Sequence, residues 1–165
     1  MDHPASHRLA MEANYALVQE LQATAERMQD IQAELDDVEV AMTEDQEEVE
    51  AYTDEIADCC DRINAIDEFV RELAAGNIPA MADVASVVAN MADEREEEEA
   101  MLKRLGEVRA CHEQQLQKLS ARLTTLQDER LELQKKGAQI WCVLGRTGVF
   151  ELAVRRLAER AVKTV

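Results

Sequence analysis

Apolar residues recur along the first half of the chain at alternating steps of three and four. One such series begins at Ala10 and ends at Leu73, and 16 of its 19 positions are apolar. Two apolar residues in every seven is the pattern of a coiled-coil helix, in which a narrow apolar seam faces a neighbouring helix. The series therefore predicts one long coiled-coil helix over residues 1–75.

A second, less regular series follows a short break in the pattern. The break is Gly76-Asn77-Ile78-Pro79, where glycine suits the residue after a helix end and proline suits the first turn of the next helix. The second series runs from Met81 to Leu133, with 11 of 16 positions apolar. We predict a hairpin loop over 76–80 and a second coiled-coil helix over 81–136, although Asp83 or Ser86 could also cap the start of this helix. A short loop makes consecutive helices antiparallel neighbours, so the expected fold is all-α, a long antiparallel helical hairpin.

Charged residues at seam positions predict how the two helices are aligned. Folding the chain at the loop places Asp45 opposite Arg109, and that match played no part in choosing either series. A buried ion pair of this kind adds little stability but fixes alignment and partner choice. The alternative is that both residues lie at the rim of a looser bundle.

The width of the apolar stripe predicts contacts beyond the hairpin. The flanking positions are charged in the middle of the chain, but the stripe widens near the loop and along one side of the second helix. The docking candidates there are Phe69, Val87, Met101 and Val108. Wide stripes require a third or fourth helix, which could come from this chain, a second copy or another subunit.

The end of the chain differs in charge from the rest. Gly137 interrupts the second series, and residues 135–165 carry seven Lys or Arg and two Glu. We predict a docking segment over 137–165 with a short basic amphipathic helix from Val149. Its candidate contact residues are Trp141, Val143, Phe150, Val154 and Leu157. The segment could fold back over residues 11–25, dock on another subunit, or lie on a membrane surface, which the acidic body of the chain would oppose.

Composition and charge narrow the class of function. The formal net charge is −17, and residues 26–61 carry 15 acidic residues against one Arg. Such a surface repels nucleic acid. It could attract a basic partner, although most charge runs of this kind are the solvated face of a coiled coil. Apolar residues make up 47% but aromatic residues 3%, which argues against both disorder and an all-β fold.

The sequence contains no arrangement of residues that predicts catalysis. No nucleophile–base set can be placed on a rigid concave scaffold, so we expect no enzyme activity, cofactor, metal or small-molecule substrate. The four cysteines form no Cys-x-x-Cys pair, which favours reduced thiols and an intracellular protein of the cytoplasm or nucleus. The start of the chain lacks the layout of a signal peptide, and no apolar run is long enough to span a membrane.

These features together favour a structural role. We expect a non-enzymatic coiled-coil scaffold subunit of a multi-subunit intracellular assembly, with other helical subunits as partners and a hetero-oligomer favoured over a homodimer. A kinetochore, tethering, nuclear-pore or cytoskeletal complex would use such a part. Two alternatives remain: an acidic binding protein or chaperone for basic clients, and a peripheral membrane adaptor that uses the C-terminal helix.

Overall fold

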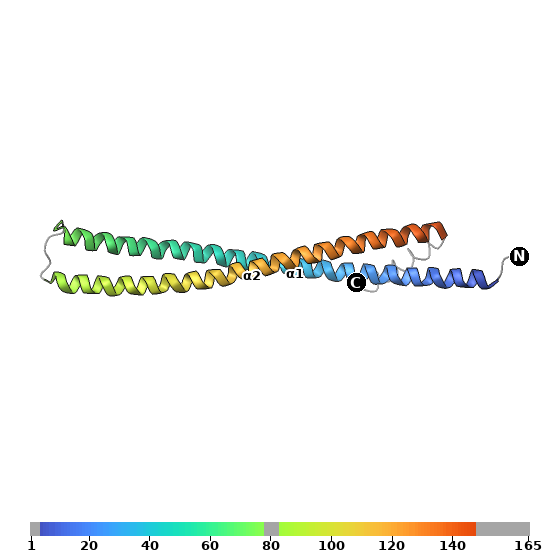
Figure 1. Ribbon diagram of the computed structural model, residues 1–165, viewed down its shortest axis with the longest axis horizontal. Helices are drawn as coiled ribbons and strands as arrows, with labels where there is room; N and C mark the ends of the chain where they lie inside the picture. The colour runs from blue at the N-terminus through green and yellow to red at the C-terminus, as the bar shows by residue number, and fades with distance from the viewer. Residues whose placement is uncertain (1–3, 78–82, 148–165) are drawn as a thin grey trace. The chain divides into compact units, whose positions relative to one another are not determined.

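Two long α-helices form the part of the chain that the structure describes. The computed structural model describes residues 4–77 and 83–147, with side chains over 11–77 and 83–146. It contains α1 (Pro4–Ala74) and α2 (Val84–Thr147), and the described residues include no strand (Figure 1). The prediction of an all-α helical hairpin is confirmed to the level of two long helices that pack against each other. The predicted short helix from Val149 lies outside the described residues.

Hydrogen bonds at the helix ends explain where α1 stops and α2 starts. Gly76 has a φ of 74°, its N–H donates to the Leu73 carbonyl at 3.2 Å, and the Asn77 N–H donates to Glu72 at 3.1 Å. This is a Schellman cap, which favours glycine at the left-handed residue. At the other end, the Asp83 carboxylate accepts a hydrogen bond from the Ser86 N–H at 3.1 Å and so caps α2. The second helix therefore begins at Val84, not at the predicted Met81.

The described residues belong to two compact units, each with its own pair of helical stretches. The terminal unit consists of residues from 1–39 and 121–165, and the loop unit of residues 40–120. In the terminal unit the first part of α1 packs against the last part of α2. In the loop unit the second part of α1 lies beside the first part of α2, on either side of the loop (Figure 1).

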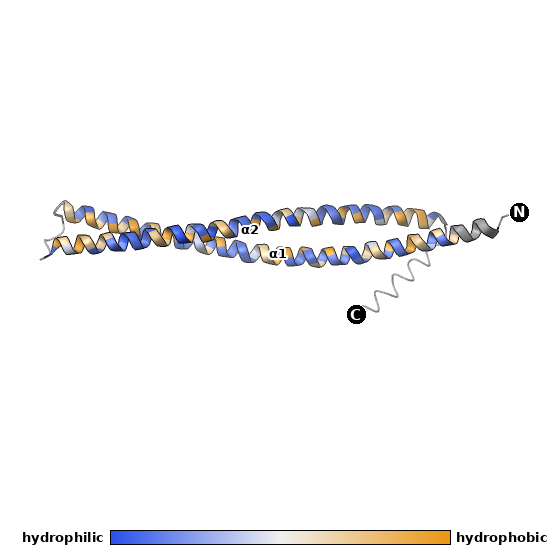
Figure 2. Ribbon diagram, turned by 60° about the horizontal axis from the view of Figure 1, so that its bottom comes forward, coloured by the Kyte–Doolittle hydropathy of each residue, from blue (hydrophilic) through white to orange (hydrophobic). Residues whose placement is uncertain are grey.

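The predicted seam is confirmed on both helices. Every seam position of α1 from Asn14 to Leu73 is buried or half-buried, and so is every seam position of α2 from Met91 to Leu133. Apolar and polar segments alternate along both ribbons in Figure 2, as a seam with solvated flanks requires. Val84 and Val88 are exceptions, with 39% and 37% of their surface exposed.

Two apolar clusters hold the terminal unit together. In the first, buried Ile31 and Leu35 of α1 meet Leu126 of α2. The second comprises Val18, Leu21, Ile140 and Leu144, against which Leu17 and Trp141 pack. Since α2 contributes Ile140 and Leu144, its seam continues well beyond Leu133.

The predicted break at Gly137 is wrong, because α2 passes through this residue to Thr147. Gly137 stands four residues after Leu133 and three before Ile140, and therefore occupies a seam position. A Cβ built there would lie 3.9 Å from Thr24 Cγ2 and 4.0 Å from Leu21 Cδ1. The glycine thus lies in the close contact between two helices and does not end one. Residues 137–147 belong to the coiled-coil helix, not to a separate docking segment.

The predicted Asp45–Arg109 pair does not form. Asp45 contacts His112, three residues further along α2, and Arg109 Nε lies 3.4 Å from Glu113 of its own helix. The physical reason is the later start of α2. Because the helix begins three residues after the predicted position, each α1 residue lies opposite an α2 residue that is further along the chain than the one predicted.

A pair of engineered thiols tests this alignment in the terminal unit. With the four native cysteines replaced by alanine, Thr24→Cys with Gly137→Cys should form an intrachain disulfide under mild oxidation, because a Cβ at position 137 would lie 3.9 Å from Thr24 Cγ2. Thr24→Cys with Arg130→Cys, the pair expected from the predicted alignment, should remain reduced. Non-reducing gel mobility and mass spectrometry read out both variants. Closure of the second pair with the first open would restore the predicted alignment.

Candidate protein-interaction surface

In the terminal unit, one edge of the seam is closed by ion pairs between the helices. We call this the terminal edge; it comprises Glu20, Arg27 and Glu34 of α1 with Arg122, Glu129 and Lys136 of α2. The residues of each helix are seven apart, so they lie along one side of it. Glu20 pairs with Lys136 at 2.8 Å, Arg27 with Glu129 at 2.8 Å, and Glu34 with Arg122. Every charge on this edge therefore has an opposite charge across the seam.

One arginine joins two carboxylates on this edge. Arg27 donates to both oxygens of Glu129 and, at 2.8 Å, to Glu34. Hydrogen bonds from Arg27 and then from Arg122 lower the pKa of the Glu34 carboxyl, because they stabilise its charged form. The terminal edge is thus satisfied within the chain.

The equivalent side of the loop unit is built from different residues. We call it the loop edge; it comprises Glu48, Glu55, Arg62 and Phe69 of α1 with Val87, Glu94, Met101 and Val108 of α2, again seven apart along each helix. Glu55 and Met101 line one shallow depression, and Phe69 and Val87 line another. Apart from Arg62, this edge therefore carries only acidic and apolar residues, whereas the terminal edge carries opposite charges that pair across the seam.

The acidic residues of the loop edge have no basic partner in the described part of the chain. Glu48 and Glu55 are exposed, and neither forms an ion pair with any described residue. Met101 and Val108 have 46% and 38% of their surface exposed. Beneath Met101, buried Leu105 and Cys59 form the floor of its depression.

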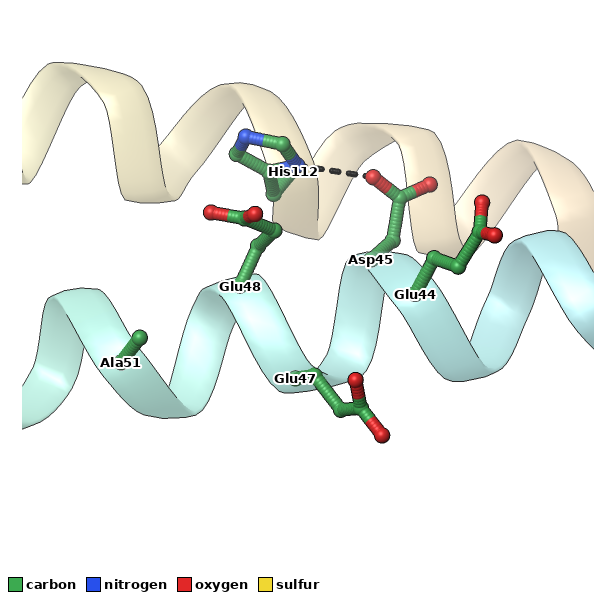
Figure 3. Close-up of a pocket in the computed structure, with 6 residues that line it drawn as sticks. All are labelled: Glu44, Asp45, Glu47, Glu48, Ala51 and His112. Atoms are coloured by element: carbon green, nitrogen blue, oxygen red, sulfur yellow. Dashed lines mark hydrogen bonds and ion pairs between the residues drawn. The ribbon is translucent and has the colours of Figure 1, made fainter.

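A third depression on α1 has the most acidic lining. His112 Nδ1 lies 2.7 Å from Asp45 Oδ1, and Tyr52 stacks on the imidazole with ring centroids 5.7 Å apart. Figure 3 shows Glu48 beside the imidazole, Glu44 next to Asp45, and Glu47 pointing away from α2. The histidine is therefore held in place by a carboxylate and a stacked ring at the seam, as a core-edge residue.

Two polar seam positions in the loop unit, Glu98 and Arg95, form ion pairs with side chains of the other helix. Arg62 donates to both oxygens of Glu98, at 2.7 and 2.9 Å, and Arg95 donates to Asp67 at 2.7 Å. Burial raises the pKa of the Cys59 thiol. A buried thiol held protonated is a poor nucleophile or metal ligand. Arg109 Nε has no hydrogen-bond partner, since its approach to Glu113 is long and misaligned.

The structure places the predicted docking residues in different environments. Met101, Val108 and Val143 are exposed. Phe69 and Val87 are half-buried, and Trp141 packs against the terminal-unit core. Phe150, Val154 and Leu157 lie outside the described residues.

Sequence reasoning missed Val84 and Val88 as surface residues. Both fit the seam pattern, but α1 ends at Ala74, and these residues of the first two turns of α2 remain exposed. The contrast between the two edges was also missed. Reading every seventh residue on the flank of each series would have shown opposite charges in one unit and Glu beside Met or Val in the other.

Residues 4–77 and 83–147 contain neither a metal-ligand cluster nor a membrane-spanning stretch. No group of three or more His, Cys, Asp or Glu residues there is arranged to hold a metal ion. Neither helix contains, in its described residues, a stretch apolar and long enough to cross a membrane.

Comparison with known proteins completes the description of this surface. Neither known protein families, nor curated proteins, nor solved structures yield a match for this chain.

Proposed function

We propose that this chain is a non-enzymatic coiled-coil subunit of a larger intracellular assembly and that it binds helices of other proteins. The observation that carries the proposal is the loop edge, where Met101 and Val108 remain exposed beside acidic residues that have no partner among the described residues. Aligned, exposed, large apolar side chains are typical of protein–protein contact sites. Each helix buries only two residues in every seven in the seam, so a third helix can pack against the flank of the pair.

Purification of the tagged chain from its own cells tests the proposal. Stoichiometric helical partners, counted by mass spectrometry, are expected with the native chain and lost with Met101→Glu and Val108→Glu combined. Leu131→Glu is the matched control, because Leu131 is 49% exposed on α2 but stands away from both edges. A chain that purifies alone, or only with itself, would refute the scaffold role.

One observation favours an acidic binding protein for basic clients as the second candidate. Glu44, Glu47 and Glu48 surround one depression, and none forms an ion pair within the described ranges. Binding through these charges would be lost between about 0.1 and 1 M salt, where the screening length falls from ~10 to ~3 Å. Binding through apolar side chains would survive this change.

The membrane-adaptor alternative depends on residues that lie outside the described ranges. It predicts that the full chain binds vesicles containing phosphatidylserine and that neutralising Arg155, Arg156, Arg160 and Lys163 abolishes this binding. Vesicle flotation measures both. Retained flotation after neutralisation would exclude this route to a membrane.

A further inference from the structure

Resting on the proposed function, we infer that the loop edge binds a basic amphipathic helix of a partner protein as a third helix. The partner is defined by its chemistry. Its apolar residues lie against Met101 and Val108, and its Lys or Arg residues lie against Glu48 and Glu55.

The charge argument comes from comparing the two edges. All three α1 residues of the terminal edge have an opposite charge on α2, at separations of no more than 2.8 Å. At the corresponding side of the loop unit, Glu55 shares a depression with Met101 and with Arg62. The guanidinium of Arg62 donates to both oxygens of Glu98, so Arg62 is not the partner of Glu55. Glu48 and Glu55 therefore have no basic partner among the described residues, and an external helix would supply one.

The apolar argument gives the periodicity of the partner. Met101 and Val108 are seven residues apart, so they stand about 10 Å apart along α2. A helix lying beside α2 covers both if it presents apolar residues at the same interval. The depression over Leu105 and Cys59 provides a hole for one of these side chains.

A second copy of this chain is a poor occupant of the same edge. Its own loop edge would bring Glu48 and Glu55 against the acidic residues of the first copy, and like charges in a contact are destabilising. Residues 26–61 carry a net charge of −14, which adds to the repulsion. A basic partner removes this repulsion and steers its own approach.

The experiment titrates the full chain into a labelled 21-residue helical peptide with Leu at a and d, Lys at e and g, and Ala and Gln elsewhere. The control peptide has Glu in place of every Lys. Fluorescence anisotropy at 50 and 500 mM NaCl should show that the chain binds the Lys peptide and does not bind the Glu control peptide. Met101→Gln with Val108→Gln should weaken binding about tenfold at both salt concentrations. Glu48→Gln with Glu55→Gln should weaken it about threefold to tenfold, and mainly at 50 mM.

A charge-matched variant distinguishes the effect of the loop-edge carboxylates from that of the chain's overall negative charge. Asp54 and Asp61 are exposed and seven apart on the outer side of α1, so Asp54→Asn with Asp61→Asn removes the same charge elsewhere. It should leave the affinity within about twofold, provided that circular dichroism shows unchanged helix content in every variant. Equal losses in the two charge variants, or no loss with the Met101 and Val108 variant, would overturn the inference.

Two further results are informative. If the Lys peptide binds only after Arg155, Arg156, Arg160 and Lys163 are changed to Gln, the chain's own C-terminal segment occupies the edge and a separate partner is refuted. If stoichiometric partners purify from cells and survive the Met101→Glu and Val108→Glu change, this inference fails while the proposed function stands. Absence of any partner in that purification removes the proposed function itself.

Discussion

Leu126→Ala is expected to destabilise the terminal unit by about 3 kcal/mol. Leu126 is completely buried, and it contacts Ile31 and Leu35 of α1 in one of the two apolar clusters of that unit. Removing a buried leucine side chain loses its transfer free energy and leaves a cavity, at a cost of ~2–5 kcal/mol. Urea denaturation followed by circular dichroism should show a lower midpoint or an early transition.

Leu131→Ala provides the control for this substitution. Leu131 lies on the same helix, five residues away, and is 49% exposed. The free energy of unfolding should change by less than about 0.5 kcal/mol, as for most surface substitutions. Equal effects at Leu126 and Leu131 would mean that the seam of α2 is not the buried face.

The second expected result is a gain in stability. Gly106→Ala and Gly137→Ala together should raise the free energy of unfolding by about 1–2 kcal/mol, because glycine inside a helix is less favourable than alanine by ~1 kcal/mol. A Cβ at Gly106 meets nothing within 4 Å, and one at Gly137 makes ordinary contact with Thr24 and Leu21. Thermal unfolding measures the gain in each single variant and in the pair.

Gly76→Ala should have the opposite sign. Gly76 is left-handed in the Schellman cap of α1, where alanine is strained, so this variant should be less stable by about 1 kcal/mol. Gly145, two residues before the end of α2 at Thr147, should respond weakly to the same change. Destabilisation by Gly137→Ala would show that the helices approach more closely at Thr24 than the structure gives.

Local pattern was sufficient to predict the helices but not their alignment. The steps of three and four from Leu17 to Leu73 depend on residues of one helix, and the buried seam follows them. The alignment depends instead on where α2 begins, and both Pro79 and Asp83 were acceptable starting points. Choosing the earlier one placed Asp45 opposite Arg109, whereas the Asp83 cap brings it to His112.

Gly137 shows why a residue type alone misleads. Glycine is common after a helix end, but Ile140 and Leu144 continue the seam beyond Gly137, so this glycine lies inside a helix. The loop edge could not be predicted in the same way, because the alignment of the helices decides whether Glu55 lies beside a basic or an apolar residue of α2. That information comes only with the fold.

The distribution of thiols makes this chain convenient for spectroscopy. Cys59 is buried and Cys60 half-buried, whereas Cys111 of the loop unit and Cys142 of the terminal unit are exposed. Brief treatment with a maleimide dye should therefore modify one site in each unit of the native sequence. A donor and an acceptor attached at these two positions would report, by energy transfer, whether the distance between them along α2 changes when a partner binds.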